Sequence, residues 1–314
     1  MKVGTAALSW IKGEQNLEKL RKITKTEAFF AYALLLPATL ALVLIRVVPL
    51  LEGIGISFTN RRLLQDRPTS FVGIDNFIRI FTEDKEFWRV LGFTFFYTIM
   101  VVLLSYCMGL IIALLMNIEI KGRGIFRTLL LMPWIIPGVV AAASWKWALN
   151  DQSGVINMLL QSLHITSKSI PFLASTKWAK VVVILVGAWK NYPYMALSLL
   201  AGLQNVPTDT KEAAKIDGAN VFQSFFRVVL PQIRPVTMVC TTLMFIWTFN
   251  NFDNIFLLTG GGPDGSTQVM SVLSYYSAFS KMNMGYASAL STVMLAIMMV
   301  LAVLYIRMVM KKED

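Results

Sequence analysis

The sequence carries little charge for its length. Charged residues make up only 15% of the 314 positions and hydrophobic residues 56%, whereas a soluble domain carries roughly 25% charged residues. This shortage indicates that lipid, rather than water, surrounds much of the chain. We therefore do not expect the two soluble domains that the length alone would permit.

Residue patterns for metal binding, disulfide bonding and catalysis are missing as well. The two cysteines, Cys107 and Cys240, both lie in apolar runs, and their spacing fits neither a metal site nor a disulfide framework. The glycine-rich segment 260–267 contains no lysine, which argues against a phosphate-binding loop. No arrangement of a nucleophile with a base is visible. We therefore expect no enzyme activity, no metal and no cofactor on this chain.

Six long apolar runs dominate the sequence. Each is close to the roughly 20 residues that an α-helix needs to cross a bilayer, and none shows the short alternating segments of a membrane barrel. The sequence therefore predicts an all-α, polytopic membrane protein with six transmembrane helices. The expected spans cover about 28–50, 91–116, 127–148, 181–203, 235–258 and 284–306.

The segment 1–27 mixes basic and acidic residues and precedes an apolar run that is too long for a signal peptide. We expect it to be a cytoplasmic tail ahead of one membrane domain, 28–314. With the N-terminus inside, 16 of the 29 Lys and Arg residues fall in cytoplasmic segments, although the outer loop 59–90 holds six. Both termini are then cytoplasmic. Orientation and anionic lipid explain the net charge of +11 better than nucleic acid does.

The cytoplasmic loop 206–235 is long for a connector and has strong internal signals. Asp209 followed by Glu212 predicts a capping box and a short helix, which Gly218 would end. A second short helix is expected over about 220–229. The product would be a helical elbow on the cytoplasmic surface.

The second helix of this elbow is expected to end before Pro231. Phe222, Phe225 and Phe226 would give it an apolar side that anchors it to the membrane domain. A surface hairpin without any partner is the alternative, since short amphipathic helices are common.

The amino-acid sequence of this loop favours a specific role. The segment EAAKIDGA, followed by FFRVVLPQIRP, closely resembles the EAA loop of ABC importer permeases. Further motifs extend the resemblance over nearly the whole chain, among them FVGIDNF (71–77), LLTGGGP (257–263) and MGYASALS (284–291). It is closest to permeases of the maltose, oligosaccharide and glycerol-3-phosphate type. The chain lacks the extra N-terminal helices and the large external insert of the maltose subunit.

This resemblance implies the ABC importer permease fold and a division of tasks between subunits. In that family the EAA loop is a coupling helix that docks on an ATP-hydrolysing subunit, so ATP would bind to that partner. The implied partners are ATPase subunits, a second homologous permease, an external solute-binding protein and membrane lipid, in a bacterial or archaeal-type plasma membrane. The positions that match the coupling motif are Glu212, Ala213, Ala214, Asp217, Gly218 and Ala219.

Polar and aromatic residues near the middle of spans four and five are typical of a sugar path, because they replace the water that a sugar loses. Pro193 would loosen the backbone there. Alternatively, these groups hold helices together. Trp247 and Asn251 are four residues apart and would share a helix face. The positions that match the sugar-holding residues of maltose-type relatives are Asn191, Tyr194, Trp247, Thr248 and Asn251.

Lys190 stands out within span four. Ten residues beyond Lys180, it would lie about 15 Å into the bilayer, where a charge costs at least about 2.5–3.5 kcal/mol. Three arrangements are open: it faces an aqueous path, it snorkels to the surface, or it pairs with an acid such as Asp253.

These features predict a permease subunit that moves a sugar, delivered by a binding protein, through an ATP-driven importer. An ABC permease for glycerol 3-phosphate, peptides or amino acids is one alternative. A secondary transporter driven by an ion gradient is another, and the lack of a repeat between the two halves counts against it. Uptake that survives ATP depletion but fails with an uncoupler would support that class.

Overall fold

The computed structural model describes residues 29–64, 68–118 and 122–310. Over these ranges the chain is helical and forms no strand, only two isolated β-bridges. The all-α class predicted from the sequence is therefore confirmed. The expected cytoplasmic tail, 1–27, lies outside the described residues.

The chain divides into two compact units, Met1–Ile56 and Ser57–Asp314. The described part of the first unit is helical and belongs to the apolar helix Phe29–Ser57, which contains the π-helical turn η1 (Val43–Val47) and the segment α2 (Val48–Ser57). This helix matches the first predicted span and continues beyond it.

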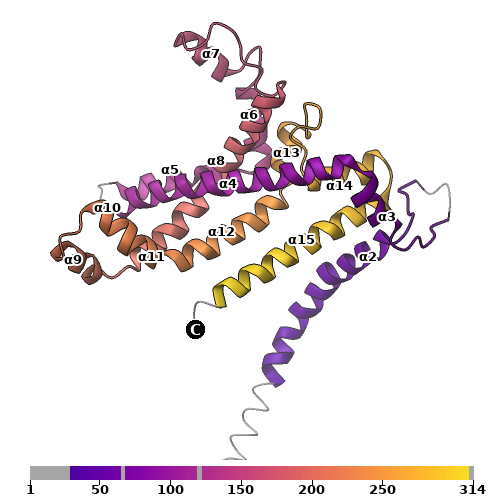
Figure 1. Cartoon of the computed structure of the whole chain (residues 1–314), viewed down its shortest axis with the longest axis horizontal. Helices are drawn as coiled ribbons and strands as arrows, with labels where there is room; N and C mark the ends of the chain where they lie inside the picture. The colour runs from indigo at the N-terminus through magenta and orange to yellow at the C-terminus, as the bar shows by residue number, and fades with distance from the viewer. Residues whose placement is uncertain (1–28, 65–67, 119–121, 311–314) are drawn as a thin grey trace, which may run out of the picture. The chain divides into compact units, whose positions relative to one another are not determined.

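The second unit holds the remaining helices (Figure 1). They are α3 (Asp75–Ile78), η2 (Arg79–Glu83), α4 (Lys85–Asn117), α5 (Arg123–Ile135), α6 (Gly138–Ala148), α7 (Val155–Ser162), α8 (Thr176–Gln204), α9 (Thr208–Ile216), α10 (Val221–Ser224), η3 (Phe225–Val229), α11 (Leu230–Gln232), α12 (Arg234–Phe249), α13 (Asp253–Leu258), α14 (Met270–Tyr275), η4 (Tyr276–Ser280) and α15 (Met284–Met310), where η marks a π-helical turn.

The two long helices α4 and α8 lie side by side at the centre of this unit and share its most extensive helix contact (Figure 1). The carboxylate of Asp84 starts α4 by accepting the backbone N–H groups of Glu86 at 2.9 Å and Phe87 at 3.3 Å. No charged residue follows between Val90 and Ile118, so the helix continues across a bilayer-sized length.

Small residues bring α4 and α8 close together. Ser105, Gly109 and Ala113 recur every fourth position of α4, and all three are buried. A Cβ atom added at Gly109 would lie 2.8 Å from the Cβ of Met195 on α8. Spacing of this kind lets helix backbones approach where hydrocarbon offers no hydrophobic driving force.

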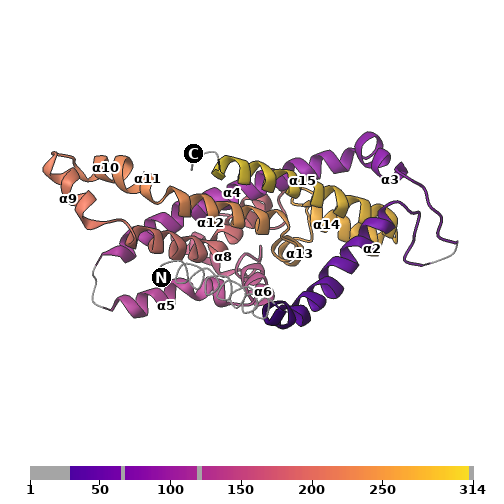
Figure 2. The ribbon, with the colours of Figure 1, turned by 90° about the horizontal axis from the view of Figure 1, so that it is seen from below.

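The buried core forms three clusters, and each of them includes residues of α4. The first joins α4 to α6, α8 and α13, the second joins it to η2, α12, α14 and α15, and the third joins it to α8 and α12. Along the unit, α9 and α10 lie at one end and α3 and α14 at the opposite end (Figure 2).

Three described helices are long and apolar enough to cross a membrane: Phe29–Ser57, Lys85–Asn117 and Met284–Tyr305. The number rises to five if each of two bent helix pairs counts as one span. α8 occupies the place of the predicted fourth span and is 29 residues long. It is less apolar than the others because Lys190 and its polar neighbours interrupt it.

The predicted third span, 127–148, is broken rather than straight. α5 and α6 meet at a bend of 91°. Pro137 has no N–H to donate, and it holds Ile136 in an extended conformation with ψ of 129°.

The predicted fifth span, 235–258, is also interrupted. α12 ends at Phe249 and α13 starts at Asp253. The side-chain oxygen of Asn251 accepts the backbone N–H of Asn254 at 3.1 Å. Such a local bond competes with the helical pattern and starts a new helix.

Candidate functional site

The predicted coupling loop folds as an elbow, but its first helix starts differently from our expectation. α9 begins directly after Pro207, so Asp209 lies inside the first turn and caps nothing. The predicted Asp209–Glu212 capping box is therefore wrong, because Pro207 takes the capping position with its fixed φ of −57°. A reciprocal capping box forms instead at α10, between Asn220 and Gln223.

Gly218 ends α9 as predicted. Its φ of +80° lies in the left-handed region, where a side chain costs roughly 1–2 kcal/mol. The N–H of Gly218 donates to the carbonyl of Lys215 at 3.1 Å, and the N–H of Ala219 donates to that of Ala214 at 2.9 Å. These two bonds form a Schellman motif, which fixes the angle of the elbow.

The second helix of the elbow runs further than predicted. α10 continues through η3 into α11, which contains Pro231, and the chain turns by 66° only at Ile233. Pro231 directly follows the π-helical turn η3, where the α-helical hydrogen-bond pattern is already interrupted, so its missing N–H is accommodated.

The coupling-motif residues lie mostly on the surface. Ala214 is buried and Ala219 is half-buried. The exposed motif residues are Glu212, Ala213, Asp217 and Gly218.

The phenylalanines of the elbow separate into two groups. Phe225 packs against the core cluster of α4, α8 and α12, as expected. Phe222 and Phe226 are 76% and 59% exposed, so the prediction that they anchor the elbow is wrong. Ile216 and Val221 are also exposed, at 85% and 83%. Exposed apolar side chains gathered on one elbow are typical of an interaction surface.

The structure brings two of the five predicted path residues into contact. The rings of Tyr194 on α8 and Trp247 on α12 meet edge to face, with centroids 5.1 Å apart. Trp134 of α5 lies 6.3 Å from Tyr194 by the same measure. Trp247 is 52% exposed. Three helices thus contribute to one aromatic cluster that has an accessible face.

Of the other three predicted residues, one is buried, one is hydrogen-bonded within its own helix, and one lies outside α12. Thr248 is only 3% exposed. The amide of Asn191 donates to the carbonyl of Gly187 on its own helix at 2.9 Å. Asn251 lies beyond the end of α12, so the expectation that it shares a helix face with Trp247 is wrong.

Within the described residues, Lys190 forms no ion pair with an acid such as Asp253, which was one of the three arrangements left open by the sequence. Its Nζ donates to the carbonyl oxygens of Pro133 at 3.2 Å and Ile136 at 2.6 Å. These carbonyls lack helical donors because α5 ends there, and they carry the negative end of the helix dipole. The nearby hydroxyl of Tyr192 donates to the carbonyl of Leu130 at 3.1 Å.

Asn254 is a polar residue that the sequence reasoning missed. Its amide donates to the hydroxyl of Tyr97 at 2.9 Å and to the carbonyl of Val183 at 3.0 Å, so it links α13 to α4 and α8. An asparagine within an apolar segment was the available signal, since polar groups at membrane depth find partners.

Comparison with known proteins gives the family. Residues 105–311 match the model described as "binding-protein-dependent transport system inner membrane component". The trehalose/maltose transport system permease protein of Thermococcus litoralis is 31% identical over 294 residues, which cover 93% of this chain and 98% of that protein. The sulfoquinovosyl glycerol transport system permease protein of Agrobacterium fabrum is 33% identical over 287 residues, 91% of this chain and 92% of that protein.

A solved structure shows the same fold. It is that of a bacterial ABC transporter involved in the import of the acidic polysaccharide alginate. The similarity has a TM-score of 0.78 at 23% sequence identity and covers 92% of this chain and 98% of that chain.

Proposed function

This chain belongs to the family of binding-protein-dependent transport system inner membrane components, and from that membership we propose that it forms half of the sugar path in an ATP-driven importer. Relatives that match more than nine-tenths of the chain carry trehalose, maltose or sulfoquinovosyl glycerol in their names. The observation that carries the proposal is the α9–α11 elbow, which exposes Glu212 and Ala213 at one end of a bundle with this fold.

The elbow is the contact with an ATP-hydrolysing partner. Glu212, Asp217 and the exposed apolar residues Ile216 and Phe222 form its accessible face. A packed elbow transmits force because the Schellman motif at Gly218 fixes the angle between its helices. ATP binds to the partner, and a second permease supplies the other half of the path. Both termini of this chain lie in the cytoplasm.

The sugar passes the aromatic cluster of Tyr194 and Trp247. An exposed indole face stacks on the apolar face of a sugar ring, and the neighbouring helix breaks supply polar backbone groups. ATP binding on the partners favours one of two arrangements of the helices, so the cluster faces each side of the membrane in turn.

Purification of the tagged chain from its native membrane tests the assembly. We expect an ATPase subunit and a second permease to co-purify, and the solute-binding protein to join when sugar is added. The reconstituted complex should then take up labelled trehalose or maltose only with internal ATP. Uptake driven by an ion gradient without ATP, or selective uptake of glycerol 3-phosphate, would overturn the proposal of an ATP-driven sugar importer.

A further inference from the structure

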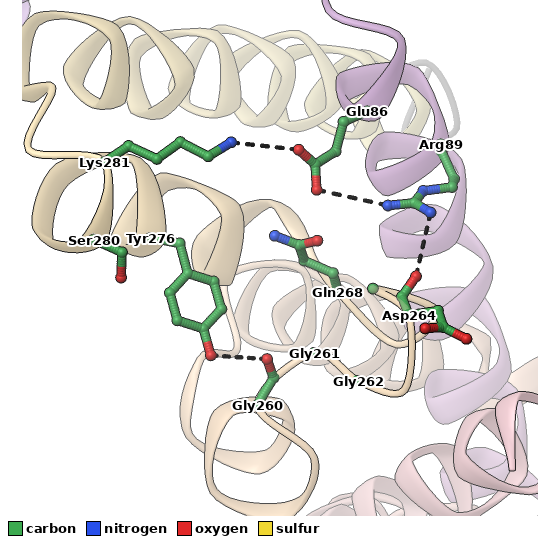
Figure 3. A pocket seen from close by; sticks show the side chains of 11 residues that line it. Glu86, Arg89, Gly260, Gly261, Gly262, Asp264, Gln268, Tyr276, Ser280 and Lys281 are labelled. Atoms are coloured by element: carbon green, nitrogen blue, oxygen red, sulfur yellow. Dashed lines mark hydrogen bonds and ion pairs between the residues drawn. The ribbon is translucent and has the colours of Figure 1, made fainter. Parts of the chain in front are cut away.

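A polar pocket of about 530 Å³ lies between the start of α4, the glycine-rich turn 259–268 and η4 (Figure 3). One oxygen of Glu86 is 3.6 Å from the guanidinium of Arg89, and the other is 3.5 Å from Nζ of Lys281. Both separations exceed the 2.7–2.9 Å typical of strong charged hydrogen bonds. The three side chains are therefore gathered around the pocket but keep capacity for a further partner.

The opposite wall of the pocket is held in shape by its own hydrogen bonds. The hydroxyl of Tyr276 donates to the carbonyl of Gly260 at 2.9 Å. The hydroxyls of Thr259 and Thr267 lie 2.7 Å apart, and that of Thr267 donates to the carbonyl of Gly262 at the same distance. A wall fixed in this way presents a preformed surface to a ligand.

Gln268 is the feature that points to a ligand. It is only 7% exposed, and its amide points into the pocket between Tyr276 and Arg89 (Figure 3). Within the described part of the chain, no group forms a hydrogen bond with this amide. Both amide atoms open onto the pocket, where water satisfies them in the absence of a ligand, and a sugar hydroxyl can replace that water.

We propose that this pocket is a second carbohydrate-binding site, which a sugar occupies before it reaches the aromatic cluster. Glu86 accepts hydrogen bonds, Arg89 and Lys281 donate them, and the Gln268 amide does both. Neighbouring sugar hydroxyls likewise donate and accept, and the Tyr276 ring offers an apolar surface. A simple anion suits the pocket less well, because the carboxylate of Glu86 lies among the cations.

The position of the pocket agrees with this role. α14, which leads directly into η4, lies at the end of the second unit opposite α9 (Figure 2), and the proposed orientation places this end outside the cell. The six residues of α13 connect the end of α12, which carries Trp247, to the turn that lines the pocket. At 1.5 Å per residue this helix spans about 9 Å. The inference rests on the proposed import of a sugar.

Cysteine protection in the assembled importer tests the site. Cys107 and Cys240 are replaced by alanine, and Ser280→Cys places a thiol on an exposed lining residue. Its reaction with a membrane-impermeant thiol reagent is timed in the importer without its binding protein, with and without trehalose or maltose, whichever the complete complex takes up with ATP. We expect the imported sugar to slow the reaction several-fold, and Gln268→Leu to remove this protection. Lys85 is exposed at the same end of α4 but lies outside the pocket. A cysteine in its place, Lys85→Cys, should react with the reagent at the same rate with and without the sugar.

The possible negative results of this experiment lead to different conclusions. An imported sugar that leaves the rate at position 280 unchanged overturns the second site but leaves sugar import standing. Protection by the sugar-free binding protein, with none from sugar alone, would make the pocket a docking surface and also overturn the inference. If the complex imports no sugar, the proposed function and this inference fall together.

Discussion

Nζ of Lys190 lies 2.6 Å from the carbonyl oxygen of Ile136, so a charged side chain of α8 caps the C-terminal end of α5. Hydrocarbon offers no donor to the free carbonyls of a broken helix. The break before Pro137 creates unpaired acceptors, and the ammonium group satisfies two of them. The lysine and the proline break therefore stabilise each other.

Lys190→Met should accordingly destabilise the complex. It keeps an unbranched side chain but removes the donor, which leaves two carbonyls unpaired at a cost of about 1–3 kcal/mol each. We expect a lower midpoint of thermal unfolding for the purified complex, together with reduced ATP-driven uptake. Lys190→Arg retains donors and should recover much of both. A methionine variant as stable as the parent would show that the contact contributes nothing.

Gly109→Ala should disturb the contact between α4 and α8. The added Cβ would meet Met195 at 2.8 Å and the backbone nitrogen of Ala196 at 2.9 Å, so the helices must move apart. Overpacking of this kind typically costs 1–3 kcal/mol. Gly92→Ala on the same helix is the matched control, because nothing lies within 4 Å of its added Cβ. Equal midpoints of unfolding for the two variants would contradict the close approach.

The long uninterrupted helices are the part of the fold that the amino-acid sequence predicts best. α4 and α15 have no proline in their interiors and long stretches without charge, so apolar length alone gives their positions. The breaks were harder to predict. Pro137 ends α5 whereas Pro193 stays inside α8. Neighbouring groups that replace lost hydrogen bonds decide between these outcomes, and a single sequence does not place them.

The contacts between side chains at the candidate site were harder still to predict from the sequence. The motif predicts an elbow with Gly218 at its corner, because left-handed backbone strongly favours glycine. The cap at Asn220 and the donors around Lys190 depend on where helices end and what lies across from them. The pattern of polar residues identified Tyr194 and Trp247, but only tertiary packing shows that they touch while Asn251 lies elsewhere.

Gly218 gives a test of the elbow. Gly218→Val places a β-branched side chain at φ of +80°, whereas Gly218→Asn fits this conformation better. We expect the valine variant to insert and assemble but to lose coupling between ATP hydrolysis and uptake. The asparagine variant should retain most of the coupling. The ratio of sugar moved to ATP hydrolysed in proteoliposomes measures it, and an unchanged ratio with valine would argue that the elbow angle is irrelevant.

Trp247→Ala tests the aromatic cluster as part of the sugar path. The indole is half-exposed and contacts Tyr194 edge to face, so its loss removes a stacking surface and little of the buried core. An aromatic contact of about 0.5–1.5 kcal/mol corresponds to a fall in uptake on the order of two- to tenfold. Co-purification of the partner subunits should not change.

Trp247→Phe separates a stacking role from a structural one. It keeps a flat ring but loses the indole N–H, so uptake should remain well above that of the alanine variant if the ring face guides the sugar. If alanine lowers the yield of assembled complex and the uptake per assembled complex stays constant, Trp247 holds α12 against α8 and the sugar passes elsewhere. Uptake is therefore normalised to the amount of assembled complex, because only that ratio distinguishes a path residue from a packing residue.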